Sequence, residues 1–301
     1  MGVAFLVLFI VLALTVPQFG TRVNLIALAL SVATVGMVAT TMLFCMASGD
    51  FDLSVEAVVT FGGVLAAVVM NQTGNVAIGV SCGVLAGGLV GLINGFVIAS
   101  LGINPLITTL ASLQMVRGLS FIVSQGSAVS ITLTAFFSLG NGVVWGLPVP
   151  IWMMLVAFLL FGYLFHKTVL GRHTLAIGGN RVAARLSGIP VTRTRILIFT
   201  MQGIMAGFVG VILTARMASG QPNSSVGFSL DVISACVLGG VSLSGGVGSM
   251  GSVIVGVLLM GTAQNVMNLL NVPTFSQYLA RGVILLCAVL FDRFRRARFR
   301  S

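Results

Sequence analysis

Charged side chains are scarce in this sequence: Asp, Glu, Lys and Arg together make up 7% of its 301 residues, whereas 57% are hydrophobic. A soluble domain carries about a quarter charged residues, so this composition places the chain in a bilayer. Lysine is nearly absent, because Lys167 is the only one. Since Lys167 does not follow a glycine, the phosphate-binding pattern G-x-x-x-x-G-K-[ST] is missing. The chain therefore does not carry that ATP site itself.

Patterns typical of metal, redox or cofactor sites are missing as well. The cysteines lie inside apolar runs without a Cys-x-x-Cys pair, so we expect buried, unreactive thiols at Cys45, Cys82, Cys236 and Cys287. His166 and His173 have no carboxylate or cysteine near them in sequence, so no metal site is predicted. Gly246-x-Gly248-x-x-Gly251 matches a dinucleotide fingerprint only formally, since it lies between two apolar segments. With no nucleophile–base pair either, a membrane enzyme is disfavoured.

The basic residues are few but clustered. The formal charge is +10, and its main groups lie in 167–195 and 293–300, next to hydrophobic segments. This distribution is typical of cytoplasmic ends of membrane spans rather than of a nucleic-acid surface. Such clusters also suit contact with anionic lipid head groups.

Hydrophobic segments predict an all-α polytopic membrane protein that forms one domain over residues 1–301. The first segment is short at its start, as expected if a cytoplasmic leader were missing. Placing the basic loop 168–193 in the cytoplasm puts both termini there too, and it makes 125–149 the largest external segment. The segment 228–244 has a second interpretation as a broken or re-entrant helix. The ten expected spans are 2–17, 25–47, 54–72, 76–101, 104–124, 150–167, 194–217, 228–244, 247–270 and 277–292.

An internal repeat is visible between FDLSVEAVVTFGGV at 51–64 and FSLDVISACVLGGV at 228–241. The two copies begin five spans apart, which is an odd number, so the halves 25–124 and 194–292 are predicted to lie inverted in the membrane. Inverted repeats around a central path are typical of transporters. One expected helix has glycines spaced four residues apart, at 83, 87, 91 and 95, so they lie on one face. A second expected helix has the same spacing at 203 and 207. Both sets predict close packing of helices.

The basic loop contains a short capped helix at 181–187. Asn180 is a good N-cap and Gly188 with Pro190 is a good stop. A helix of two turns needs tertiary packing for its stability, so we expect it to dock on a partner. The alternative is a basic cytoplasmic loop without a docking role.

Several polar residues lie inside expected spans, where they are costly unless they face a cavity or a partner. Arg117 and Arg281 occur once in each repeat, and they are predicted to pair with an acid, to contact backbone carbonyls or to line a path. One face of the expected span 247–270 carries amide side chains. These can bind a neutral hydroxyl-rich solute or form interhelical hydrogen bonds. The candidate path residues are Asn94, Gln114, Arg117, Gln264, Asn268 and Arg281.

The acids are few enough to interpret singly. Asp292 adjoins the basic tail, and Asp231 matches Ser54 in the repeat. Asp50, Asp52 and Glu56 sit at a helix junction, where Asp52 or Ser54 is predicted to cap the following span. A gate or proton-linked site is the functional alternative.

The chain resembles permease subunits of bacterial ATP-binding-cassette sugar importers of the ribose/xylose/arabinose/galactoside group. The resemblance covers essentially the whole chain, and the C-terminal stretches are most similar to the arabinose members. Two features depart from the family pattern: the abrupt N-terminus and Arg181, where members often carry an acid. The matching stretches are ASGDFDLSV, GLINGFVIASLGINPLITTLA, GRHTLAIGGNRVAARLSGIPV, VISACVLGGVSLSGGVGS, NVMNLLN and QYLARGVILLCAVLFDR.

This resemblance implies a non-catalytic subunit of the bacterial inner membrane that moves a monosaccharide inward. Two permease copies would form the pathway, a separate ATPase would bind ATP and Mg²⁺, and a periplasmic binding protein would deliver the sugar. The coupling-helix motif then maps to Asn180, Arg181, Ala183, Ala184, Arg185, Ser187 and Gly188. The alternative is a self-sufficient ion-coupled transporter or channel, which requires an essential acid among Asp50, Asp52, Glu56 and Asp231.

Overall fold

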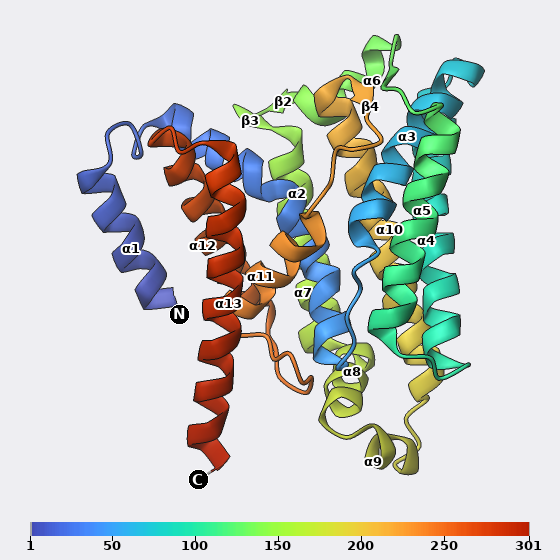
Figure 1. Cartoon of the computed structure of the whole chain (residues 1–301), viewed down its shortest axis with the longest axis vertical. Helices are drawn as coiled ribbons and strands as arrows, with labels where there is room; N and C mark the ends of the chain where they lie inside the picture. Colours follow the sequence, from blue (N-terminus) through green and yellow to red (C-terminus); the bar gives the residue numbers. More distant parts are fainter. Residues whose placement is uncertain (1, 301) are drawn as a thin grey trace.

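Long helices cross the molecule side by side, and short elements cap its two ends (Figure 1). The structure is a computed structural model that describes the backbone of residues 2–300 and the side chains of residues 2–290 except Ala4 and Ala288. The side chains of the basic tail 293–300 and of Asp292 lie outside the described residues. The long helices are α1 (Gly2–Thr15), α2 (Arg22–Ala47), α3 (Val55–Thr73), α4 (Val76–Ala99), α5 (Pro105–Ser124), α7 (Val149–Lys167), α10 (Val191–Met217), α12 (Met250–Leu269) and α13 (Thr274–Arg300).

Helices occur at the predicted spans, which confirms a polytopic helical membrane protein but not the number of ten crossing helices. Among the described residues, seven helices are long and apolar enough to cross a membrane: α2, α3, α4, α5, α7, α10 and α12. α2 passes through the centre of the core, where its residues from Gly36 onward are nearly all buried. α7, α10, α11 and α12 pack around it.

The segment expected to span at 228–244 is a shorter helix, α11 (Phe228–Gly239). Its 12 residues reach about 18 Å, short of the roughly 30 Å of a hydrocarbon core. The helix ends because Gly240 adopts a left-handed conformation with φ of 106°, and the Val241 N–H donates to the Cys236 carbonyl at 3.0 Å. Turns at 222–227 precede it, so α11 is short at both ends, which fits the second interpretation of this segment as a broken helix (Figure 1).

α4 and α10 approach each other so closely that only glycine fits at their crossing. A Cβ atom at Gly87 would lie 2.3 Å from the Gly203 carbonyl oxygen, and one at Gly203 would lie 2.2 Å from that of Gly87. α3 joins the same contact, because a Cβ at Gly62 would lie 2.8 Å from the Gly207 Cα. Small residues let helix backbones touch where lipid provides no hydrophobic driving force. The predicted close packing of both glycine sets is confirmed.

The helices of the two predicted repeat halves run in opposite directions (Figure 1). α2 descends and α10 ascends in Figure 1, and α3 ascends where α11 descends. α4 and α5 differ from α12 and α13 in the same way. α3 packs against α5, and α11 packs against α13.

The segment 125–149 forms small elements at the upper end of Figure 1 rather than an irregular loop. β1 (Val129–Ser130) pairs antiparallel with β4 (Ser219–Gly220), so this segment is joined to the turn that leads to α11. α6 (Thr134–Asn141) follows, and β2 (Val143–Val144) pairs with β3 (Leu147–Pro148).

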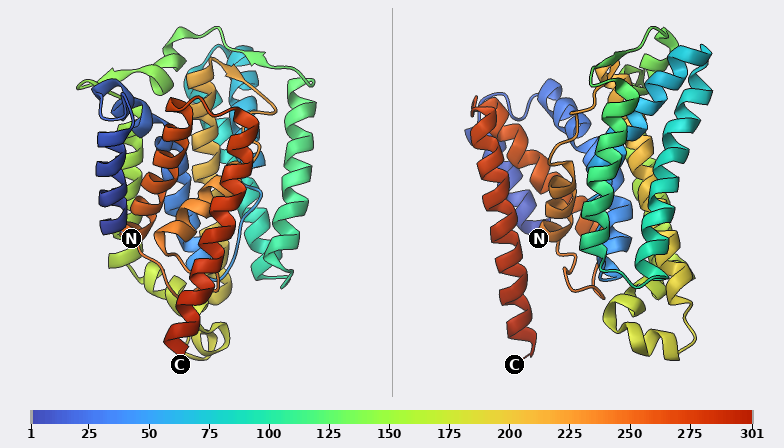
Figure 2. Two further views of the ribbon diagram at one scale, coloured as in Figure 1. Left: turned by 60° about the vertical axis from the view of Figure 1, so that its left-hand side comes forward. Right: turned by 45° about the vertical axis from the view of Figure 1, so that its right-hand side comes forward.

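The opposite end carries α8 (Val169–Gly179) and α9 (Arg181–Leu186). Both views of Figure 2 show these helices projecting at the same end as the C-terminal end of α13. The four cysteines are free, as expected. Cys45 and Cys236 are buried, but Cys82 is partly buried and Cys287 is exposed, which corrects the expectation of four buried thiols.

Candidate functional site

The short helix of the basic loop forms where the sequence predicts it. The Asn180 side-chain oxygen accepts hydrogen bonds from the backbone N–H groups of Val182 and Ala183, both at 3.0 Å. Gly188 follows the helix with φ of 81°, a conformation that suits glycine at a helix end. Ser187 is the C-cap. Both ends of α9 are therefore fixed by local sequence.

α9 is held on the molecule by one face and leaves the other uncovered. Ala184 is 4% exposed and packs with Ile177 and Val191. Val182 and Leu186 are 70% and 84% exposed. Ala183, Arg185, Ser187 and Gly188 are exposed as well. Of the predicted coupling residues, Ala184 alone is buried, because it packs toward the body of the protein.

Arg181 begins α9 but turns back toward the membrane helices. Its Nη2 atom donates to Asp50 Oδ1 at 3.0 Å. The same carboxylate accepts two hydrogen bonds from Arg195 of α10, at 2.7 Å to Oδ2 and 2.8 Å to Oδ1. Arg195 also donates to the Ile98 carbonyl at the end of α4, at 3.3 Å. We call Asp50, Arg181 and Arg195 the Asp50 junction; it joins α9, α10 and α4 to the segment that leads into α3.

Inside the membrane region, the first turns of α3 and α11 are joined directly. The Ser229 hydroxyl accepts from the Glu56 N–H at 3.1 Å and donates to the Leu53 carbonyl at 2.9 Å. The Gly227 N–H donates to Glu56 Oε2 at 2.9 Å. α3 and α11 thus begin at one place, although they are more than 170 residues apart in sequence.

Each membrane-embedded arginine pairs with an acid of one of these first turns. Arg117 of α5 pairs with Glu56 of α3. Arg281 of α13 pairs with Asp231 of α11, with 3.0 Å between Nη1 and Oδ2. This confirms acid pairing among the alternatives predicted for the arginines. Charges inside a membrane protein normally face a protein interior or a water-filled cavity, so these pairs mark a polar region.

The remaining candidate path residues separate into two groups. Gln264 of α12 lies beside the Asp231 carboxylate, and Gln114 lies exposed on α5 three residues before Arg117. Asn94 is buried and donates to the Ser54 hydroxyl at 3.0 Å. The Asn268 side-chain oxygen accepts from Gln277 at 3.0 Å. Asn94 and Asn268 therefore make interhelical hydrogen bonds, which was the structural alternative for these amides.

The acids of the α2–α3 junction are also partnered. The prediction that Asp52 or Ser54 caps α3 is wrong, because Ser54 is the N-cap residue but makes no side-chain cap. Asp52 instead accepts from the Ser54 N–H at 2.9 Å, and the Ser54 hydroxyl accepts from Asn94 at 3.0 Å. The sequence singled out Glu56 and Asp231 but did not predict which arginine each one meets, nor the contacts of Ser229, because these partners are distant in sequence.

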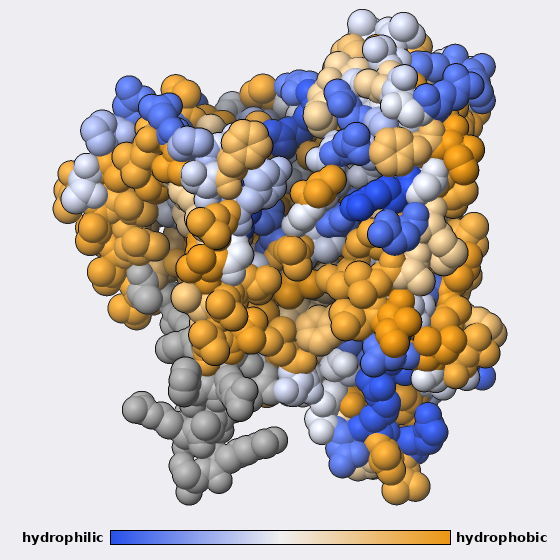
Figure 3. Space-filling model, viewed as in Figure 1, coloured by the Kyte–Doolittle hydropathy of each residue, from blue (hydrophilic) through white to orange (hydrophobic). Residues whose placement is uncertain are grey.

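Hydrophilic residues interrupt the hydrophobic belt on one face of the molecule. Figure 3 shows them in blue over the region where α3 and α5 lie in Figure 1. Arg117 and Arg281 are both partly exposed. A face with partly exposed ion pairs at this depth is unsuited to lipid contact.

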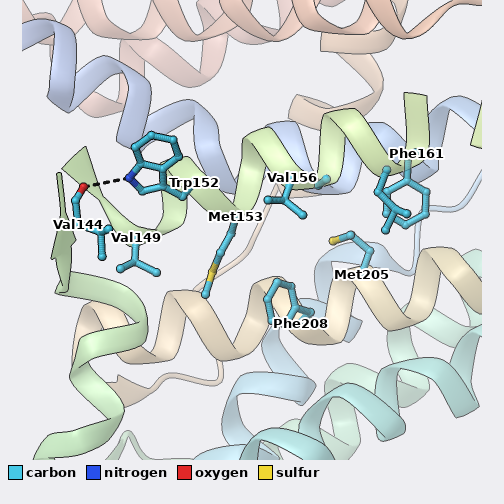
Figure 4. Close-up of a pocket in the computed structure, with 10 residues that line it drawn as sticks. Val144, Val149, Trp152, Met153, Val156, Phe161, Met205 and Phe208 are labelled. Carbon is cyan, nitrogen blue, oxygen red and sulfur yellow. Dashed lines mark hydrogen bonds between the residues drawn. The ribbon is translucent and has the colours of Figure 1, made fainter. Parts of the chain in front are cut away.

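A cavity of about 390 Å³ between α7 and α10 has different chemistry. Figure 4 shows its apolar lining, including Met153, Val156, Met205 and Phe208. The Trp152 Nε1–H donates to the Val144 carbonyl at 3.0 Å, so this donor is already used within the protein (Figure 4). A hydroxyl-rich solute would find no partners there. Nor do the described residues contain a cluster of three metal-binding side chains.

Comparisons with known proteins agree with these features. The family model "Branched-chain amino acid transport system / permease component" matches residues 24–289. The L-arabinose transport system permease protein AraH of Escherichia coli K12 is 54% identical over 301 residues, covering 100% of this chain and 92% of that protein.

Two further relatives extend the comparison. The L-arabinose ABC transporter permease protein AraH of Azospirillum brasilense is 54% identical, covering 99% of this chain and 88% of its own. The ribose import permease protein RbsC of Bacillus subtilis is 37% identical, covering 95% and 90%. No solved structure matches the chain.

Proposed function

The chain belongs to the branched-chain amino acid transport system / permease component family, and on this premise we propose that it is the permease subunit of an ATP-driven L-arabinose importer. Its identity to two L-arabinose permeases exceeds its identity to a ribose permease, 54% against 37%. The chain is a multi-pass protein of the bacterial inner membrane. It is non-catalytic, and ATP and Mg²⁺ bind to a separate ATPase subunit.

The proposed topology has about ten membrane-crossing segments, cytoplasmic termini and an inverted repeat. Support for the repeat comes from the opposite directions of α2–α5 and α10–α13 (Figure 1). The arginine–acid pairs also occur once in each half. Support for the orientation comes from the basic residues of 167–195, which lie around α8 and α9.

α9 is the proposed coupling helix, and the ATPase is its partner. Val182 and Leu186 form its exposed apolar surface, which a monomer has no reason to leave in water. The position of this surface is fixed by the packing of Ala184 and by the hydrogen bonds of Arg181 and Asn180. These three residues are not part of the surface itself. Arg185, Ala183, Ser187 and Gly188 are its exposed neighbours.

The proposed translocation path follows the polar face with the two arginine–acid pairs. A second permease copy closes this face, because lipid does not suit partly exposed ion pairs. Gln114 and Gln264 belong to the path beside Arg117 and Arg281. A periplasmic sugar-binding protein docks on the end formed by 125–149, and lipid contacts the remaining apolar surface.

The ion-coupled alternative requires a titrating acid in the path. Asp50, Glu56 and Asp231 each pair with an arginine instead, and Asp52 accepts a hydrogen bond from the Ser54 N–H, so each of the four candidate acids has a partner within the protein. The observation that carries the ATP-driven proposal is the exposed apolar surface of α9.

The test is uptake of L-arabinose into proteoliposomes supplied with the ATPase and the binding protein. Leu186→Glu should abolish ATP-driven uptake, because a charge replaces an apolar contact at the exposed surface of α9. Leu186→Met is the matched control and should retain uptake. Uptake without the ATPase that follows an imposed proton or sodium gradient would contradict the proposal.

A further inference from the structure

A small cavity lies between the first turn of α11 and the facing part of α13. Its volume is about 110 Å³, and much of its lining is apolar, including Leu230 and Leu285. The polar side chains of the lining are Asp231, Ser234, Tyr278 and Arg281. Tyr278 is partly exposed, and the cavity of Figure 4 has no such group of polar side chains.

Donors and acceptors remain available in this cavity. Arg281 carries five N–H donors, and within the described structure only Nη1 donates, to Asp231 Oδ2. Asp231 retains lone pairs on both oxygens, with Gln264 beside it. Because the pair is neutral overall, the cavity has no net attraction for a cation or an anion. It suits adjacent hydroxyl groups, each of which donates and accepts.

An aromatic ring lies beside this pair. The Arg281 guanidinium carbon is 5.6 Å from the centre of the Tyr278 ring, which holds the two side chains together. The exposed part of the Tyr278 ring offers an apolar surface to the C–H face of a sugar ring, and its hydroxyl offers a polar tip. Polar groups on one side and an aromatic ring on another match the amphipathic character of a monosaccharide.

The size and openness of the cavity indicate transient binding. A volume of 110 Å³ equals that of about four water molecules at the liquid share of roughly 30 Å³ each. One face of a sugar ring fits, and the rest of the molecule stays on the open side. Weak binding of this kind suits a transport step, where tight binding would slow release.

The second arginine–acid pair does not offer the same site. Glu56 accepts from Arg117 on one oxygen and from the Gly227 N–H on the other, so this pair also binds the residue that precedes α11. It fastens α3 to α5 and α11. The two halves therefore use similar pairs differently.

We propose that the cavity of Asp231, Ser234, Tyr278 and Arg281 binds a neutral monosaccharide during transit, with the ion pair holding ring hydroxyls and Tyr278 stacking on the ring. This inference rests on the proposed import of a sugar. The sugar is proposed to contact α11 and α13 at this cavity.

The first test is ligand-observed saturation-transfer NMR with the chain in lipid nanodiscs, L-arabinose as the probe and no ATPase. Wild type should transfer saturation to the sugar ring protons. Tyr278→Leu and Asp231→Asn should each weaken binding about tenfold. Tyr278→Leu removes the aromatic contact, and Asp231→Asn removes the charged acceptor. Tyr278→Phe keeps the ring and should retain most of the transfer. Equal transfer in all four proteins overturns the proposal.

ATP-driven uptake separates the proposed site from the proposed function. If wild type imports L-arabinose and Tyr278→Leu imports at the same rate, the site is refuted and the import function stands. If wild type shows sugar binding that Tyr278→Leu loses, but no ATP-driven uptake, the site stands and the function fails. Should Asp231→Asn fail to fold, Tyr278→Leu still decides, because Tyr278 is exposed and its loss leaves the ion pair intact.

Discussion

The Asp50 junction allows a stability prediction with a definite magnitude. Asp50 and Arg195 are 1% and 6% exposed, and two hydrogen bonds join them. Replacing Asp50 with Ala leaves the Arg195 guanidinium buried without its counter-ion. Removing one partner of a buried pair typically costs about 3–5 kcal/mol, so Asp50→Ala should lower the free energy of unfolding by that amount.

Arg181 provides the comparison within the same junction. Its side chain is 41% exposed, and Asp50 keeps both Arg195 hydrogen bonds when Arg181 is removed. Solvent-exposed pairs contribute about 0–1 kcal/mol, so Arg181→Ala should have a small effect. Two arginines on one carboxylate are thus expected to differ severalfold in their importance for stability.

The assay is equilibrium unfolding in mixed micelles, followed by tryptophan fluorescence. The matched control is the double variant Asp50→Leu with Arg195→Met, which removes both buried charges and should recover most of the loss, because Arg181, which also loses its partner, is partly exposed. The reasoning is refuted if Asp50→Ala costs less than about 1 kcal/mol, or if the double variant is as unstable as the single one.

Two further predictions concern helix packing. Gly203→Leu should prevent accumulation of folded protein, because its Cβ alone would lie 2.2 Å from the Gly87 carbonyl oxygen; Gly118→Leu, at a site with open space, should accumulate normally in membrane fractions. Gln202 is fully buried, and in the described structure neither atom of its amide has a hydrogen-bond partner. Gln202→Leu should therefore unfold at an equal or higher denaturant concentration than wild type, and a loss above about 1 kcal/mol would reveal a partner for the amide.

Much of the helical arrangement follows from local sequence. Long apolar runs predict the spans, because a helix satisfies its backbone hydrogen bonds internally in lipid. Asn180 and Gly188 predict the ends of α9, since capping involves neighbouring backbone groups. The glycines of α4 predict a close crossing, because their spacing places them on one helix face.

Local sequence also identified candidates whose partners it did not specify. Arg117 and Arg281 stand out as charges inside spans, but an arginine alone does not determine whether it meets a carbonyl, an acid or a path. Ala184 lies in the coupling motif, yet only packing against Ile177 and Val191 turns it inward. Each outcome depends on neighbours that are distant in sequence.

The sequence by itself determined the membrane-embedded helices, the capped helix of the basic loop and the close glycine crossing, because each depends on hydrophobicity or on residues within a few turns. The tertiary structure decided which charges meet. Asp50 and Arg195 are 145 residues apart, and Arg117 and Glu56 are 61 apart. Such pairs form only when several helices have packed, since their energy depends on burial and geometry rather than on sequence spacing. The cavity at Asp231 and Tyr278 is decided in the same way, by the packing of α13 on α11.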